Sequence, residues 1–168
     1  MSITLALIRR IDESRRWRHA IHPQPTRNPM KITVQTQVRS NIDAVWSAYS
    51  NPDDITQWNS ASDDWHTPHC RVDLREGGTF STRMEAKDGS MGFDFEGTYT
   101  RVVPQQLIEY RMSDGREVAV HFEDGADGVL VRVVFDAETE NSPEIQQQGW
   151  QSILDSFGRY VGTSHGAG

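Results

Sequence analysis

A single long amphipathic segment, residues 142–162, follows a chain that is otherwise patterned as β-strands. Ser142 suits a helix N-cap, Pro143 suits the first helical position, and Gly162 suits the end of a helix. At about 100° per residue one face collects the apolar positions: Ile145, Gly149, Trp150, Ile153, Leu154, Phe157, Tyr160 and Val161. One helix must therefore cover a whole sheet. A sheet that curls round one helix tends to enclose apolar space, which is typical of a ligand pocket.

Length and charge narrow the classes of protein to which the chain can belong. With 168 residues it is long enough for one domain with a core, and short for two. Residues 30–168 carry 11 basic against 22 acidic side chains, whereas nucleic acids and anionic membranes select clustered cations, so we expect neither as a partner. No apolar run approaches the roughly 18 residues of a membrane span. The single cysteine, Cys70, excludes an intrachain disulfide, and we expect a cytoplasmic protein.

Residues 1–29 differ in composition from the rest of the chain. They hold six Arg against two acidic residues, and three prolines interrupt any helix after residue 22. We expect a leader that is disordered or not part of the native protein, with Met30 as the natural start. The alternatives are a membrane-surface helix and an ordered packing element. The same reading gives one domain at 30–163 and a disordered tail at 164–168.

The hydrophobic pattern of the central part of the chain has the period of β-strands. Alternating apolar residues predict a strand at 31–38, and two short helical segments follow it near 42–50 and 52–58. Six more strands are predicted at 71–75, 79–86, 92–103, 107–112, 117–123 and 129–139. Short glycine-rich turns separate them, which requires antiparallel neighbours. The order predicts an α+β fold: a curved antiparallel sheet of about seven strands, two short helices after the first strand, and one long C-terminal helix.

Alternation along these strands assigns the two faces of the sheet. One face is apolar and aromatic, for example at Phe80, Tyr110 and Phe135. The other is charged, for example at Asp94 and His121. This is the pattern of an antiparallel sheet that is covered on one side and solvated on the other.

Several short motifs are spread along this pattern. They are Trp46, Asn51-Pro52, Trp58, Asp73-Leu74-Arg75-Glu76-Gly77-Gly78-Thr79-Phe80, Phe95-Glu96-Gly97-Thr98-Tyr99, Val120-His121-Phe122, Gln148-Gly149-Trp150 and Ile153-Leu154. Taken together, they resemble the helix-grip (SRPBCC) superfamily, which includes lipid-transfer START domains and birch-pollen-type proteins. Within it, the closest likeness is to the Hsp90-ATPase-activator-homologue-like branch, over about Met30 to Val161.

The resemblance implies a sheet that grips the C-terminal helix, with a cavity between them and the two short helices at one mouth. It does not imply one function, because members of the superfamily carry lipids, bind hormones, cyclise polyketides or assist a chaperone. Many relatives in this branch have Trp-Trp where this chain has Trp58-Asn59, which changes the polarity at the cavity mouth. The chaperone-binding N-terminal domain of the eukaryotic activators has no counterpart in this sequence.

The segment 63–70 is the most polar candidate site. It offers His66, His69 and Cys70 as metal ligands, but no second ligand pair with a recognisable spacing accompanies them. We expect a solvated loop with Trp65 packed inward, and neither a metal nor a cofactor. A nucleophilic Cys70 would need a depressed pKa and a nearby base, and a buried thiol at the start of a strand is the interpretation we prefer.

These observations predict a domain that binds a small, largely apolar molecule as a carrier or sensor. The alternatives are a cyclase- or hydrolase-type enzyme that uses the same cavity, and a module that interacts with a chaperone. We expect a monomer or weak homodimer. The predicted pocket residues are Trp58, Trp65, His66, Met84, Phe93, Phe95, Tyr99, Tyr110, Met112, Phe135, Gly149, Trp150 and Phe157. Tyr99 and Tyr110, with His66 at the mouth, are expected to orient the polar end of the ligand.

Overall fold

The computed structural model describes residues 29–164 as one antiparallel sheet with three helices. The strands are β1 (Lys31–Val38), β2 (Trp65–Val72), β3 (Thr79–Ala86), β4 (Gly92–Val103), β5 (Leu107–Met112), β6 (Glu117–Gly125) and β7 (Gly128–Asp136). The helices are α2 (Ile42–Ser50), α3 (Pro52–Trp58) and α4 (Pro143–Ser164). Residues 1–28 and 165–168, which hold almost all of the predicted leader and tail, lie outside the described residues.

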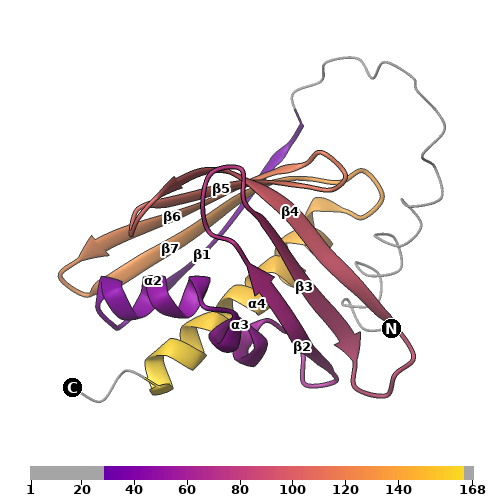
Figure 1. Cartoon of the computed structure of the whole chain (residues 1–168), viewed down its shortest axis with the longest axis horizontal. Coiled ribbons are helices and arrows are strands. Elements are labelled where there is room, and N and C mark those ends of the chain that lie inside the picture. Colours follow the sequence, from indigo (N-terminus) through magenta and orange to yellow (C-terminus); the bar gives the residue numbers. More distant parts are fainter. Residues whose placement is uncertain (1–28, 165–168) are drawn as a thin grey trace.

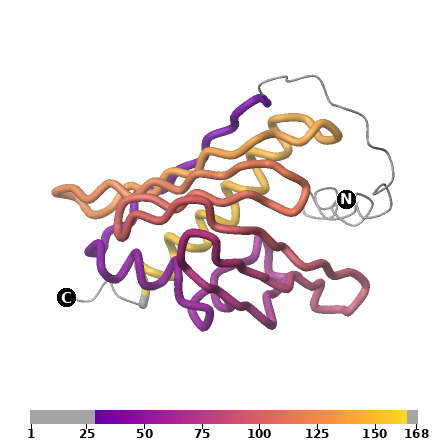
Figure 2. The backbone as a smooth tube through the Cα atoms, turned by 45° about the horizontal axis from the view of Figure 1, so that its top comes forward, coloured from indigo at the N-terminus to yellow at the C-terminus, as the bar shows by residue number. Residues whose placement is uncertain are grey.

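The sheet has seven strands in the order β1-β7-β6-β5-β4-β3-β2, so β1 and β2 form its edges. Figures 1 and 2 show it curling round α4, which crosses the inner face, while α2 and α3 lie beside the C-terminal half of α4. The helix-grip fold expected from the sequence is therefore confirmed. No helix within residues 29–164 has the length and apolar character needed to cross a membrane.

Each helix begins at a side chain that caps it. The carboxamide oxygen of Asn51 accepts from the Asp53 N–H at the start of α3, and Ser142 Oγ accepts from the Ile145 N–H, 3.3 Å away, at the start of α4. For α2 the cap is Asn41, whose side-chain oxygen accepts from the Ala44 N–H at 2.9 Å. The predicted end of α4 at Gly162 also differs, since the helix continues to Ser164.

The largest departure from the predicted elements is at β2. The segment 63–70 was expected to be a loop with a strand at 71–75, yet residues 65–72 form the edge strand, and only the inward packing of Trp65 agrees. The physical reason is a bulge between His66 and His69: before it the buried side chains are Trp65 and Thr67, and after it the less exposed side chains are Cys70 and Val72, which are partly buried. One inserted residue hides the period of two from a reading of the sequence.

The ends of two other strands also differ from prediction. β6 extends to Gly125 and β7 ends at Asp136, not at residue 139. Asp136 is only 4 % exposed, and its carboxylate accepts from the Lys31 ammonium and the Glu117 N–H, which ties β7 to both neighbours. Beyond it, the buried Gln146 side chain bonds to backbone groups of Glu138 and Asn141, so residues 138–141 form a fixed loop instead of continuing the strand.

Glutamines of α4 cover the free edge of β1. Gln151 donates from its carboxamide to the Gln35 carbonyl at 2.9 Å and accepts from the Gln35 N–H at 3.4 Å. One turn earlier, Gln147 donates to the Thr33 carbonyl at 3.4 Å. These side chains satisfy backbone groups that an edge strand otherwise leaves to solvent.

Gly128→Ala is expected to destabilise the fold by about 2–4 kcal/mol. Gly128 begins β7 with a φ of 110°, and a Cβ added there would lie 2.1 Å from the Val38 carbonyl oxygen. Both obstacles are backbone, so no rotamer change relieves them. Gly125→Ala is the matched control, because its Cβ would lie 3.8 Å from the nearest atom, the carbonyl oxygen of Gly128. Urea unfolding of both variants measures the difference, and an equal loss in the two would contradict this account.

Candidate functional site

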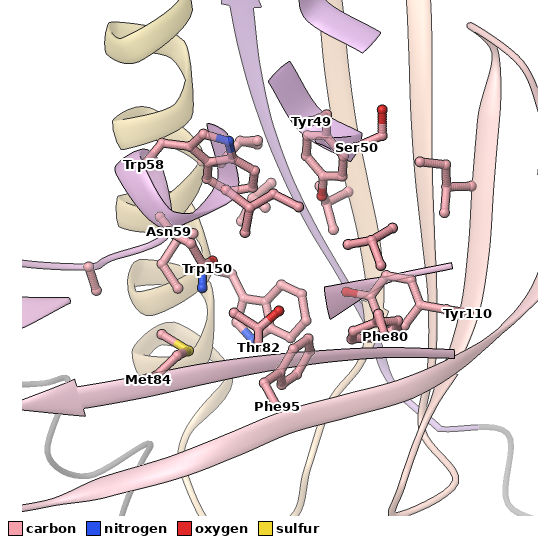
Figure 3. Close-up of a pocket in the computed structure, with 18 of the residues that line it drawn as sticks. Tyr49, Ser50, Trp58, Asn59, Phe80, Thr82, Met84, Phe95, Tyr110 and Trp150 are labelled. Carbon is pink, nitrogen blue, oxygen red and sulfur yellow. The ribbon is translucent and has the colours of Figure 1, made fainter. Parts of the chain in front are cut away.

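A pocket of about 190 Å³ lies between α4 and the inner face of the sheet. Figure 3 shows Trp58, Tyr49, Tyr110, Phe80, Phe95 and Trp150 around it. Both the sheet and the helices contribute to its walls. Strands β3, β4 and β5 form one side, and the ends of α2 and α3 form the top. The side opposite the sheet is formed by four residues of α4: Gly149, Trp150, Ile153 and Leu154. Most of this lining is aliphatic or aromatic, as expected for a site that binds apolar molecules.

The wall on the sheet side is a cluster of aromatic rings. Phe80 of β3 packs edge-on against Tyr110 at 4.9 Å and lies 5.2 Å from the ring of Tyr99 and 5.7 Å from that of Phe95. Opposite them, Trp150 stacks on Phe135 at 4.1 Å with the ring planes 11° apart. Such contacts fix the orientation of the rings, so the pocket has a defined shape.

The top of the pocket is formed where α2 and α3 meet α4. Tyr49 lies 5.3 Å from Trp58, and both rings pack edge-on against Phe157 of α4, at 5.2 and 5.0 Å. The Trp58 indole N–H donates to the Ala48 carbonyl at 2.9 Å, which joins α3 to α2. Tyr160 donates to the Asp54 carboxylate, and this bond raises the pKa of Tyr160 to about 12. The two short helices are therefore held over this end of the pocket by specific contacts.

Three tyrosines, Tyr49, Tyr99 and Tyr110, form a tyrosine cluster in the lining. Within residues 29–164, Ser40 Oγ is the one fully buried polar side-chain atom without a hydrogen-bond partner. The hydroxyls of the three tyrosines also form no hydrogen bond with residues 29–164, but they are not among the fully buried atoms, so each keeps accessible surface, and all three residues line the pocket. Figure 3 shows the hydroxyls of Tyr49 and Tyr110 pointing inward. Burial raises the pKa of all three phenols above the ordinary value of 10, so they are neutral donors at physiological pH.

The structure brings together eight of the residues predicted to line the pocket. These are Trp58, Met84, Phe93, Phe95, Tyr99, Tyr110, Gly149 and Trp150. Phe135 and Phe157 also point to the inner side, but both are fully buried within the packed core, behind Trp150 and beneath Tyr49 respectively. Met112 belongs to the same core at the far end of β5.

Trp65 and His66 lie on β2 and do not line the pocket. Trp65 is buried with Met84, Ala86 and Phe93. His66 points the other way along the strand and is exposed, with Nε2 3.6 Å from the Glu85 carboxylate on the outer face. Both border a separate polar hollow between α3, β2 and the end of α4. The expected role of His66 at the pocket mouth therefore has no counterpart in the geometry.

Several lining residues were not among those predicted. Tyr49, Asn59, Phe80 and Thr82 are the most informative of them. Alternation along β3 assigned Phe80 to the inner face, and Thr82, two residues further on, shares that face, so the signal for both was present in the sequence. Tyr49 and Asn59 flank the two short helices, whose docking positions depend on contacts distant in sequence.

The side chains that line the pocket carry no formal charge. No lining residue is an Asp, Glu, His, Lys or Arg. No group of three or more His, Cys, Asp or Glu residues in the described part of the chain is arranged to hold a metal ion. Burial raises the pKa of the Cys70 thiol and outweighs the opposite effect of Thr82 Oγ1, which lies 3.5 Å from the sulfur, so the net effect of the surroundings disfavours the thiolate that a nucleophile needs.

Comparison with known proteins agrees with this architecture. A family model described as "Activator of Hsp90 ATPase homolog 1-like protein" matches residues 39–162, which span the fold from the end of β1 to the end of α4. The chain belongs to this family. No match was found among curated proteins.

Solved structures of several other proteins share the fold. An AHSA1-like protein from Aeromonas hydrophila, solved by NMR in solution, is 51% identical with a TM-score of 0.77, and the match covers 80% of this chain and 94% of that one. A protein from Cytophaga hutchinsonii is 43% identical with a TM-score of 0.68, over 82% of this chain and 94% of that one. A Nitrosomonas europaea protein at 17% identity and a TM-score of 0.67, over 82% of this chain and 97% of that one, shows likeness of fold alone.

Proposed function

We propose that this AHSA1-like domain binds one small, largely apolar molecule between α4 and the sheet and acts as its carrier or sensor. The observation that carries the proposal is the aromatic-lined pocket of about 190 Å³. In another protein, an engineered apolar cavity of about 150 Å³ stays dry and binds benzene. A somewhat larger apolar space suits a molecule of about two fused rings or a comparable aliphatic body.

Energetics support a useful affinity. A ligand that buries about 300 Å² of apolar surface gains roughly 7 kcal/mol from its removal from water. The loss of translational and rotational freedom offsets part of this gain. The rings that form the walls are already fixed by their mutual contacts, so little further ordering is required on binding. Because 7 kcal/mol with nothing subtracted corresponds to a dissociation constant of about 10 μM, constants from tens of micromolar to the millimolar range are expected.

The alternatives draw less support from the described residues. An enzyme of the cyclase or hydrolase kind requires a titratable group aimed into the pocket, and the tyrosines are the sole titratable side chains in its lining. A chaperone-interaction module is suggested by the family description, but such a module presents an exposed apolar patch. Met30 is the one large apolar side chain of residues 29–164 that is strongly exposed, at 60 %.

Native mass spectrometry of the protein purified from its own host tests the proposal directly. A co-purifying apolar molecule, released and identified on denaturation, is the expected result and gives the chemical class of the ligand. If the protein has the mass of the unliganded chain, and no lipid or aromatic metabolite in a panel raises its melting temperature, the proposal is overturned and the interaction module becomes the favoured function.

A further inference from the structure

We propose that the ligand of the pocket is uncharged and carries an oxygen that accepts hydrogen bonds from the tyrosine cluster. This inference rests on the proposed function and narrows it to one chemical class: a neutral molecule with an apolar body and a carbonyl or similar accepting oxygen at one end. The class excludes ionised carboxylates, including fatty acids in their usual form at neutral pH.

The first support is the position of the three hydroxyls. They come from α2, β4 and β5, which are distant in sequence, and they open onto one pocket without a partner among residues 29–164. The Phe80 ring packs on Tyr99 and Tyr110, while Trp58 and Phe157 hold the ring of Tyr49. Fixed rings fix their hydroxyls, so the donors are positioned before a ligand arrives. Buried polar groups are generally satisfied in proteins, and an accepting atom of a ligand would satisfy these.

The second support is that the remaining polar side chains are mostly occupied. Asn59 donates from Nδ2 to Thr67 Oγ1 at 3.2 Å, and Ser50 donates to the Trp46 carbonyl. Thr82 Oγ1 lies within 3.5 Å of the Cys70 sulfur. The tyrosine cluster is thus the largest group of hydrogen-bond donors in the lining that have no partner among residues 29–164, and the Trp150 indole N–H is one further such donor.

The third support is the charge of the lining. It holds no acidic or basic side chain, so a buried ionic group would lose its hydration without gaining a counter-charge. The three phenols show the same penalty on negative charge: burial raises the pKa of Tyr49, Tyr99 and Tyr110 and so disfavours their ionised forms. A pocket that penalises a phenolate penalises a ligand carboxylate in the same way.

Three naphthalene probes of matched shape test the inference by isothermal titration at neutral pH. They are 2-acetylnaphthalene, which has an accepting carbonyl, 2-isopropylnaphthalene, which is the hydrocarbon of the same outline, and 2-naphthoate, which is an anion. The wild-type protein is expected to bind the first two, and to bind 2-naphthoate at least about 100-fold more weakly than the ketone because the anion is buried unpaired.

Tyrosine-to-phenylalanine variants separate hydrogen bonding from packing, because they keep the rings. In a variant carrying Tyr49→Phe, Tyr99→Phe and Tyr110→Phe, we expect the ketone to bind about tenfold more weakly and the hydrocarbon to bind within about twofold of wild type. Tyr160→Phe is the matched control. Its hydroxyl is bonded to Asp54 and does not line the pocket, so the ratio of the two affinities should not change.

The outcomes distinguish this inference from the function on which it rests. If no probe binds the wild-type protein, the proposed function falls and the inference falls with it. If the hydrocarbon binds but the triple variant weakens both neutral probes equally or neither, only the inference is overturned. Binding of 2-naphthoate as tight as that of the ketone overturns it as well.

Discussion

Gly149→Leu is expected to weaken the binding of 2-isopropylnaphthalene at least about 100-fold while the protein remains folded. Gly149 is buried on the face of α4 that lines the pocket, so the isobutyl group of a leucine enters a space of only about 190 Å³. Glycine in a helix interior costs about 1 kcal/mol relative to good helix formers. The substitution should therefore leave the melting temperature unchanged or raise it, and calorimetry of binding and of unfolding measures both effects.

Gly162→Leu is the matched control, because it makes the same substitution in the same helix. A Cβ added at Gly162 would have no neighbouring atom within 4 Å, and the residue is exposed. It should gain similar helix stability and retain binding. If folded Gly149→Leu protein binds the probe as tightly as wild type, the probe does not occupy the space between α4 and the sheet.

Phe157→Ala is expected to destabilise the protein by about 3–5 kcal/mol. The side chain is fully buried and packs edge-on against both Tyr49 and Trp58, so it joins α4 to α2 and α3 at once. Truncation leaves a void among aromatic rings that are held by other contacts and cannot collapse into it. Guanidinium unfolding, with a check that the m-value is unchanged, measures the loss.

Phe95→Ala gives the comparison on the pocket side. Phe95 is partly buried and already borders the pocket, so its removal enlarges an existing space and should cost about half as much. A loss of less than about 1 kcal/mol for Phe157→Ala would show that the two short helices are not held through this residue.

The fold could be predicted because its signals are local. Alternation along β3, β5 and β7 assigned Met84, Tyr110 and Phe135 to the inner face without any tertiary information, and the structure buries all three. The position of strand β2 was predicted wrongly because its alternation is interrupted. The bulge after His66 adds one residue, so inward-facing positions are odd-numbered before the bulge and even-numbered after it.

The wall of the pocket could be predicted only in part, for a different reason. Alternation tells that a side chain points inward, but not whether another side chain meets it there. Phe135 and Phe95 both point inward, yet Phe135 is covered by Trp150 whereas Phe95 borders open space. Tyr49 shows the same limit for helices, since its place at the pocket depends on where α2 docks against Phe157.

The glutamines of α4 that cover β1 have a consequence for partners. Peptide-binding proteins often recruit an extended segment as an additional strand, which requires free backbone groups along a sheet edge. On β1 the backbone groups of Gln35 and the Thr33 carbonyl are already taken by Gln151 and Gln147. On β2 the bulge and Pro68 break the regular ladder. Neither edge of the described sheet therefore offers a fully regular ladder on which another chain can align, so we expect a protein partner to recognise side chains instead.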